Sequence, residues 1–147
     1  NNAGLGHFGK IAELSTAQWD EMFDLNMRGV FLATSEALPH LRKAGESAVV
    51  NVASLAGKNA FVGGGGYAAT KHALLGFSRC LMLEERPNGV RVLAICPGSV
   101  ATEFSRHSDE RRARIIQSQD VADSILHMLK LPQNAMVSEI DILPSNP

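Results

Sequence analysis

Two short apolar runs are the feature that most constrains what this 147-residue chain can fold into. Residues 47–54 read SAVVNVAS and residues 90–96 read VRVLAIC, and β-branched side chains are frequent in both. Short runs with little polar alternation are typical of strands that are buried on both faces of a parallel sheet. Residues 137–143 alternate enough to form a third strand. The pattern therefore predicts a parallel sheet of about three strands.

The stretch before the first run has the pattern of a long helix. Apolar residues recur near helical spacing over about 16–43. Ser15 and Gln18 have the spacing of a capping box, which would start the helix there. Pro39 is expected to kink the end of this helix or to shorten it, and Gly45 is expected to stop it.

Two further helices are expected between and after the apolar runs. One covers about 67–85, and the other is expected to be capped by Asp120 and to reach about Leu129. The polar segment 102–117 is predicted to form a short helical flap. Helices between buried strands imply right-handed crossovers, so we expect an α/β fold, a Rossmann-like doubly wound parallel sheet, with residues 1–147 as a single domain.

Composition and charge exclude several classes of partner. Hydrophobic residues make up 45% of the chain and charged residues 20%, as in an ordinary globular protein. A formal net charge of −1 argues against nucleic acid or an anionic membrane as the main partner. No apolar run has transmembrane length, so no membrane partner is expected.

The cysteines and histidines do not predict a metal site. Cys80 and Cys96 both lie in apolar surroundings, which predicts buried, inert thiols in a reducing compartment and hence a cytoplasmic protein. The five histidines are scattered and no pair of CxxC motifs occurs. We therefore expect no zinc site.

A serine, a tyrosine and a lysine carry the most specific chemical signal. Ser54 ends the first apolar run, and the four-residue spacing of Tyr67 and Lys71 puts both on one face of a helix. A lysine ammonium beside a phenol favours the phenolate, so the tyrosine becomes a proton donor and acceptor near neutral pH. Because ligands of open parallel sheets bind beyond the carboxyl ends of the strands, we expect these side chains to converge with Pro97 and Gly98 at one rim.

Five motifs in this chain share the order and spacing of one protein family. They are Asn1-Asn2-Ala3-Gly4, Asn26 within DLNMRGVF, Ser54 within NVASLAG, Tyr67-Ala68-Ala69-Thr70-Lys71, and Pro97-Gly98-Ser99-Val100-Ala101-Thr102. With these motifs the chain resembles the C-terminal part of a classical short-chain dehydrogenase/reductase. The resemblance covers nearly the whole chain. It implies an oxidoreductase that interconverts a small-molecule alcohol with a ketone or aldehyde and uses NADP or NAD.

The resemblance also implies a role for each matching residue. Tyr67 would be the general acid in reduction and the general base in oxidation, while Lys71 would lower the pKa of Tyr67 and bind the nicotinamide ribose. Ser54 would hold the substrate oxygen together with Tyr67. Asn26 would hold a water in a proton relay that ends at Lys71. The further residues expected to line the cofactor are Asn1, Ala3, Gly4, Pro97, Gly98, Val100 and Thr102.

Two departures from the family pattern shape the expectations. The nucleotide-binding half of the family, with its glycine-rich turn, has no counterpart in this sequence. We therefore expect weak dinucleotide binding by this chain alone, no readable choice between NAD and NADP, and an unpaired sheet edge at 48–53. The ending at 139–144 lacks the glycines that are typical of acyl-carrier-protein ketoacyl reductases. This favours short hydroxy acids and other short alcohols over 3-oxoacyl groups as substrates.

Two functions remain open at this point. The first is catalysis of alcohol and carbonyl interconversion. The second is a catalytically inactive fragment that acts as an oligomerisation module. In the family the helices corresponding to 16–43 and 67–85 pair with their copies, so the resemblance implies a homodimer or homotetramer. A nucleic-acid-binding domain has little support, because no basic and aromatic face is evident.

Overall fold

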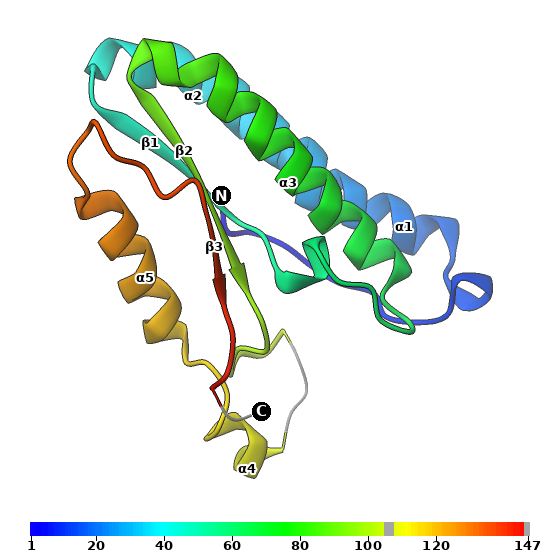
Figure 1. Ribbon diagram of the computed structural model, residues 1–147. Coiled ribbons are helices and arrows are strands. Elements are labelled where there is room, and N and C mark those ends of the chain that lie inside the picture. The colour runs from blue at the N-terminus through cyan, green and yellow to red at the C-terminus, as the bar shows by residue number, and fades with distance from the viewer. Residues whose placement is uncertain (105–107, 146–147) are drawn as a thin grey trace.

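All three apolar runs form strands in the computed structural model, which describes residues 1–104 and 108–145. The strands are β1 (Ser47–Val52), β2 (Val90–Pro97) and β3 (Glu139–Ile142). They form one sheet in the order β1-β2-β3, and both neighbouring pairs are parallel. Helices α2 and α3 lie on one side of this sheet and α5 lies on the other (Figure 1). The α/β fold with a doubly wound parallel sheet is therefore confirmed.

The described helical segments follow the predicted order. They are η1 (Ile11–Glu13), α1 (Thr16–Phe23), η2 (Asp24–Gly29), α2 (Val30–Ala44), η3 (Leu55–Gly57), α3 (Gly65–Glu85), η4 (Arg86–Asn88), α4 (Asp109–Arg112) and α5 (Ser118–Lys130). The predicted flap at 102–117 contains α4, and residues 105–107 of that flap lie outside the described part of the chain. No helix in the described ranges is long and apolar enough to cross a membrane.

The long helix predicted over 16–43 is present as α1, η2 and α2 in direct succession. Its predicted capping box is confirmed, because the Ser15 side chain accepts a hydrogen bond from the Gln18 N–H and the Gln18 side chain accepts one from the Ser15 N–H. Pro39 lies inside α2 and does not shorten it. The helix ends at Gly45, whose φ of 79° belongs to the left-handed region that glycine adopts without strain. The π-helical segment η2 was not foreseen.

The third predicted helix is real, but Asp120 does not cap it. Helix α5 begins at Ser118, and Gln117 occupies the N-cap position. The Asp120 carboxylate instead accepts a hydrogen bond of 2.8 Å from the Gln117 N–H, as the third helical residue of a capping box does. The prediction therefore placed the cap three residues too late, at the position that supports the cap rather than at the cap itself.

The outer edge of β1 is partly paired, which corrects the expectation of an open edge at 48–53. The Asn1 nitrogen donates to the Val50 carbonyl and the Val52 nitrogen donates to the Asn1 carbonyl, each at 2.9 Å. These two bonds have the pattern of a parallel ladder. An extended segment in register satisfies the free main-chain groups of an edge strand, and residue 1 does so here.

The apolar core lies between the sheet and α3. Leu74, Leu75 and Leu81 of α3 are buried against alternate residues of β2. Cys96 is buried there, as expected, but Cys80 is exposed. The prediction of a buried Cys80 was wrong because the apolar neighbours in its sequence lie on both sides of α3. Leu83, three residues further on, is 57% exposed.

A bidentate ion pair joins the ends of α2 and α3. The Arg42 guanidinium donates to both carboxylate oxygens of Glu85, and the Nε to Oε2 distance is 2.8 Å. Glu85 is 2% exposed and also accepts a hydrogen bond from the Asn88 amide. The hydrogen bond from Arg42 holds the pKa of the Glu85 carboxyl below its ordinary value.

Arg42→Ala is expected to lower the free energy of unfolding at neutral pH, because it leaves the Glu85 carboxylate without its cation. The pKa of Glu85 is depressed in the folded state, so this contribution is complete at neutral pH and disappears as the pH falls through that pKa. Denaturant unfolding at several pH values measures both effects. Arg28→Ala, which breaks an exposed pair with Asp24, is the control and should change stability by less than about 0.5 kcal/mol. Equal losses in the two variants would contradict the prediction.

Candidate active site

The carboxyl ends of β1 and β2 bring the predicted catalytic groups together. Ser54 lies two residues beyond β1 and caps η3, where its Oγ accepts a hydrogen bond of 3.1 Å from the Ala56 nitrogen. The same Oγ lies 3.5 Å from the carbonyl oxygen of Pro97, the last residue of β2. Parallel pairing of the two strands therefore places Ser54 at the rim where both strands end.

Tyr67 and Lys71 reach this rim from the first turns of α3. Tyr67 is 8% exposed, and the Ser54 hydroxyl lies close enough to lower the pKa of its phenol. Lys71 is 6% exposed, and its Nζ donates a hydrogen bond of 2.9 Å to the Val52 carbonyl. The ammonium lies 5.7 Å from the centre of the Tyr67 ring. Serine, tyrosine and lysine thus occupy one site, as their spacing predicted.

Burial determines the pKa values of Tyr67 and Lys71. It raises the pKa of Tyr67, and the hydrogen bond from Ser54 only partly opposes this. It lowers the pKa of Lys71 to about 8, while the nearby Cys96 acts weakly in the other direction. The expectation that Lys71 lowers the pKa of Tyr67 is therefore not met in this structure. The physical reason is that withdrawal from water disfavours both charged forms, phenolate and ammonium.

Asn26 is fully enclosed and bonded within the protein. It is 1% exposed and lies in the π-helical segment η2. Its Oδ1 accepts from the Leu5 nitrogen, and its Nδ2 donates to the Leu5 carbonyl and to Thr70 Oγ1, at 2.9 to 3.0 Å. Thr70 Oγ1 in turn donates to the Tyr67 carbonyl at 2.8 Å. Both amide protons of Asn26 are thus used, and one acceptor position of Oδ1 remains for a water.

The N-terminal segment lies beside the lysine. A Cβ on Gly4 would come within 3.3 Å of Asn26 Oδ1 and within 3.8 Å of Lys71 Nζ, so a main chain without a side chain fits closely here. The Asn1 amide donates to Thr34 Oγ1 and to Asn51 Oδ1, at 3.2 and 2.8 Å. The amide nitrogen of Asn1 is therefore directed to protein partners.

The segment after β2 is held by two neighbouring parts of the chain. The Gly98 nitrogen donates to the Ile142 carbonyl at the end of β3. Val100 forms a parallel bridge with Ile116, and the Thr102 nitrogen donates to the Val100 carbonyl at 2.9 Å. These bonds fix residues 97–102 at the carboxyl ends of the strands, and this segment is called the ledge below.

The Lys71 ammonium has hydrogen-bonding capacity left over. An ammonium has three N–H donors, and among the described residues Lys71 donates a hydrogen bond to the Val52 carbonyl. Its other donors can therefore serve the hydroxyl groups of a ligand. The main chain at Gly4 lies beside this ammonium with no side chain in between.

Three phenylalanines beside Tyr67 were not identified from the sequence. The Phe8 and Phe104 rings lie 5.5 and 5.4 Å from the Tyr67 ring, measured between centres. Phe61 lies 6.2 Å from Phe8. They come from three irregular segments, so no periodicity connects them. The one available signal was the position of Phe8 and Phe61 next to glycine-rich stretches, which Phe104 does not share.

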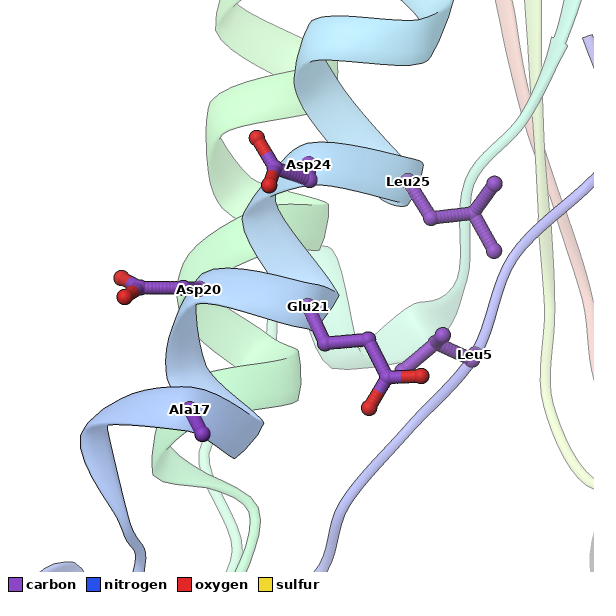
Figure 2. Close-up of a pocket in the computed structure, with 6 residues that line it drawn as sticks. All are labelled: Leu5, Ala17, Asp20, Glu21, Asp24 and Leu25. Atoms are coloured by element: carbon purple, nitrogen blue, oxygen red, sulfur yellow. The ribbon is translucent and has the colours of Figure 1, made fainter.

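An open depression of about 650 Å³ lies elsewhere, against α1 and η2. Its lining residues are Leu5, Ala17, Asp20, Glu21, Asp24 and Leu25 (Figure 2). Ser54, Tyr67 and Lys71 are not among them. In Figure 2 the Glu21 side chain points toward Leu5, whereas Asp20 points away from it. Three carboxylates on the rim would repel the phosphates of a dinucleotide.

Carboxylates and a thiol also meet at the other edge of the sheet. Ligand atoms of Cys96, Glu139 and Asp141 all lie within 4.8 Å of one another. Lys58 Nζ lies 2.6 Å from Glu139 and 2.5 Å from Asp141, so a protein cation already faces both carboxylates. Burial raises the pKa of Cys96 to about 11, and this thiol is therefore protonated at neutral pH. These charges favour an internal ion pair over a metal site.

Comparison with known proteins places these motifs in one family. Residues 1–113 match the family described as short chain dehydrogenase. An uncharacterized oxidoreductase of Staphylococcus epidermidis is 31% identical over 144 residues, which cover 98% of this chain and 63% of that protein.

Two solved structures resemble the fold over almost the whole chain. An alcohol dehydrogenase from the archaeon Thermococcus sibiricus, complexed with 5-hydroxy-NADP, matches with a TM-score of 0.87 and 29% identity and covers 98% of this chain and 61% of that one. A 3-ketoacyl-(acyl-carrier-protein) reductase from Brucella melitensis, complexed with NADH, matches with a TM-score of 0.86 and 26% identity, and covers 96% of this chain and 63% of that one. The chain thus spans less than two thirds of the length of these proteins.

Lys71→Met is expected to make the cofactor-free protein more stable at pH 7. The pKa of Lys71 falls from 10.5 to about 8 on folding, and a difference of this size destabilises the charged form by about 3 kcal/mol. Loss of the hydrogen bond to Val52 offsets about 1 kcal/mol, so a net gain of about 2 kcal/mol is expected.

The pH dependence of the free energy of unfolding is a second test with the same variant. The unfolded chain binds more protons than the folded one between the two pKa values, so wild-type stability should rise from pH 8 to 10 relative to Lys71→Met. Urea unfolding across this range measures the effect. Lys43→Met, at an exposed position of α2, should change neither stability nor its pH dependence. A destabilised Lys71→Met protein would show that burial is not the dominant influence on this lysine.

Proposed function

The chain belongs to the short chain dehydrogenase family, and on this premise we propose that the protein containing it is an oxidoreductase that uses NADP or NAD to interconvert an alcohol with a ketone or aldehyde. The observation that carries the proposal is the meeting of Ser54, Tyr67 and Lys71 at the strand rim, with the Lys71 ammonium 5.7 Å from the Tyr67 ring centre. NADP- and NADH-type ligands in similar structures support the choice of cofactor class.

The chain supplies a proton donor and a hydrogen-bond donor for the substrate oxygen. Reduced nicotinamide, when bound, supplies the hydride that forms the new C–H bond at the carbonyl carbon. The Tyr67 hydroxyl gives its proton to the carbonyl oxygen, so the C=O group becomes a secondary or primary alcohol. Ser54 donates a hydrogen bond to the same oxygen and stabilises the negative charge that develops there. The reverse direction uses the Tyr67 oxygen as the base.

The remaining predicted residues would hold the cofactor and return the proton. Lys71 offers two N–H donors to the ribose, and the main chain at Ala3 and Gly4 borders the same space. The ledge after β2 would contact the nicotinamide through Pro97, Gly98, Val100 and Thr102. Asn1 would act by fixing the segment 1–4 at the sheet edge, because its own polar groups bond to protein. A water on Asn26 would connect Tyr67 and Lys71 to solvent.

The substrate is a small carbonyl compound or alcohol. The two structures most relevant to its class are an alcohol dehydrogenase and a ketoacyl reductase, which act at a carbonyl or hydroxyl group. We propose the same functional group as the reacting centre here. The sequence at 139–144 favours a short alcohol or hydroxy acid over a ketoacyl group.

Self-association is a second function that a specific observation favours. Phe31 and Leu32 of α2 are 54% and 50% exposed, and Leu83 of α3 is 57% exposed. A partner that covered these side chains would remove their apolar surface from water. We propose that α2 and α3 pair with their copies in a homodimer or homotetramer. A catalytically inactive module would keep this contact and lose turnover.

Tyr67→Phe should abolish the proposed reaction without unfolding the protein. Loss of the acid–base hydroxyl is expected to lower kcat by about 10²- to 10⁴-fold. Turnover by the full-length protein with NADPH or NADH measures this, and circular dichroism reports folding. Ser35→Ala removes a hydroxyl that bonds to Leu32 on α2 and should leave turnover unchanged. Undiminished turnover by Tyr67→Phe would overturn the catalytic assignment.

Sedimentation velocity tests the proposed association. The full-length protein should sediment as a dimer or tetramer, and Phe31→Asp together with Leu83→Asp should shift it toward monomer, because both place a charge in an apolar contact. Leu126→Asp, at a 49% exposed position on α5, is the control and should not. A wild-type monomer at micromolar concentration would contradict the proposal.

A further inference from the structure

Half of the aromatic residues of this chain gather at the proposed acid–base group. The chain has one tyrosine, one tryptophan and six phenylalanines. The tyrosine and three of the phenylalanines form one cluster, in which Phe8 contacts Tyr67, Phe104 and Phe61 at ring-centre distances of 5.5, 6.2 and 6.2 Å. The phenyl group, defined here as Phe8, Phe61 and Phe104, therefore contacts the residue proposed to transfer the proton through Phe8 and Phe104, and Phe61 extends it through Phe8.

Much of the apolar surface of the phenyl group is exposed to solvent. Tyr67 is 8% exposed, whereas Phe8, Phe61 and Phe104 are 52%, 48% and 44% exposed. Apolar surface left in water is unfavourable by about 25 cal/mol per Å², so a ligand that covers these rings gains binding energy at that position. The covering group would lie next to the Tyr67 side chain.

Glycines create the space that the rings occupy. A Cβ on Gly6 would lie 2.8 Å from the Phe8 ζ carbon and 3.1 Å from the Phe104 ζ carbon. A Cβ on Gly64 would lie 2.3 Å from the Phe61 ring. Since neither glycine has a positive φ, the rings themselves and not the backbone conformation explain why a side chain does not fit there.

The loops that carry the rings are joined to each other. The Gly9 nitrogen donates a hydrogen bond of 2.9 Å to the Gly63 carbonyl, which connects the segment of Phe8 to that of Phe61. Phe104 belongs to the segment after β2 that also carries Thr102, whose Oγ1 accepts from the Phe104 nitrogen at 3.3 Å. The phenyl group is therefore part of the strand-end rim.

The phenyl rings themselves do not suit a carboxylate substrate. They carry no hydrogen-bond donor, so a carboxylate placed among them would leave water without a replacement hydrogen bond. Within the described residues, Arg112 donates to the Thr102 carbonyl and already pairs with Glu103 at 3.5 Å. An uncharged aromatic substituent, in contrast, can add further tilted ring contacts of the kind seen between Phe8 and Phe104.

We propose that the substrate carries an aromatic ring next to its carbonyl or hydroxyl group, and that Phe8, Phe61 and Phe104 bind this ring. The inference rests on the proposed function, because it places the reacting oxygen at Tyr67 and Ser54. It differs from the substrate class that the chain ending favoured, since a short hydroxy acid would present a carboxylate to the rings.

A pair of matched ketones tests this in the full-length protein. Acetophenone and cyclohexyl methyl ketone differ in the aromaticity of one ring, so the ratio of their kcat/KM values isolates its contribution. Phe8→Leu and Phe104→Leu keep an apolar side chain and remove a ring. Each is expected to lower this ratio by about 2- to 10-fold, the range of one aromatic pair. Trp19→Leu, which removes a ring from an exposed site on α1, should leave it unchanged.

Binding of acetophenone is measured separately from its turnover. Saturation-transfer NMR with acetophenone and oxidised cofactor should show transfer from the protein to the aromatic ring protons of acetophenone in wild type. The transfer should be weaker in the double variant Phe8→Leu, Phe104→Leu. Gly6→Ala should alter the ratio in the same direction, because its methyl group displaces both rings. Pyruvate should be a poorer substrate than acetophenone.

The outcomes distinguish failure of the aromatic-substrate proposal from failure of the proposed oxidoreductase function. An unchanged ratio and unchanged NMR transfer in the phenyl variants, or a preference for pyruvate, would overturn the aromatic substrate while a Tyr67-dependent reaction would still support the oxidoreductase. A lower Tm in the phenyl variants with an unchanged ratio would show that the rings pack against protein, and would also overturn it. Full activity of Tyr67→Phe would instead reject the proposed function itself.

Discussion

The side-chain amide of Asn26 is the interaction on which the rest of the site depends. A fully buried amide must keep its hydrogen bonds, because leaving one unmade costs about 1–3 kcal/mol. Its bonds to the Leu5 main chain and to Thr70 join the N-terminal segment to α3, and Thr70 extends the connection to the Tyr67 carbonyl. The first turn of α3 is thereby fixed against the segment that holds Gly4. Asn26 lies in a π-helical segment, a feature that is frequent at functional sites.

Burial and charge act in opposite directions at this site, and burial dominates. Enclosure raises the pKa of Tyr67 and lowers that of Lys71, so the protein without its cofactor favours a neutral phenol and a weakly held ammonium proton. A neutral phenol is the form that donates a proton in reduction. The hydroxyl groups of a ribose would give the Lys71 ammonium the hydrogen-bond partners that it lacks, and hydrogen bonding to the charged form raises a lysine pKa. A cofactor bound in this way would therefore couple its binding to the protonation of Lys71.

The regular elements could be predicted from the sequence, whereas features that depend on distant contacts could not. The strands and the capping box at Ser15 follow from local patterns, and Ser54 and Tyr67 meet because parallel strands end at the same rim. The exposure of Cys80 depends on which face of α3 meets the sheet, and the pairing of Asn1 with β1 depends on a contact across fifty residues. The pKa of Tyr67 required knowledge of its burial, because the helical spacing to Lys71 specifies proximity alone.

The proton-transfer groups and the phenyl group lie on different kinds of structure. Ser54 follows a strand and Tyr67 lies in a helix, so hydrogen bonds of the sheet and of α3 set their positions. Phe8 and Phe61 lie on irregular segments whose positions depend on a few contacts, such as the bond between Gly9 and Gly63. Substitutions in these segments can reshape the apolar surface without disturbing the strand ends. If Tyr67 and Ser54 carry the reaction and the phenyl group binds the substrate, reaction type and substrate choice would be specified by separate parts of the chain. The motif residues would then indicate the chemistry, and the loop contacts would indicate what the substrate carries.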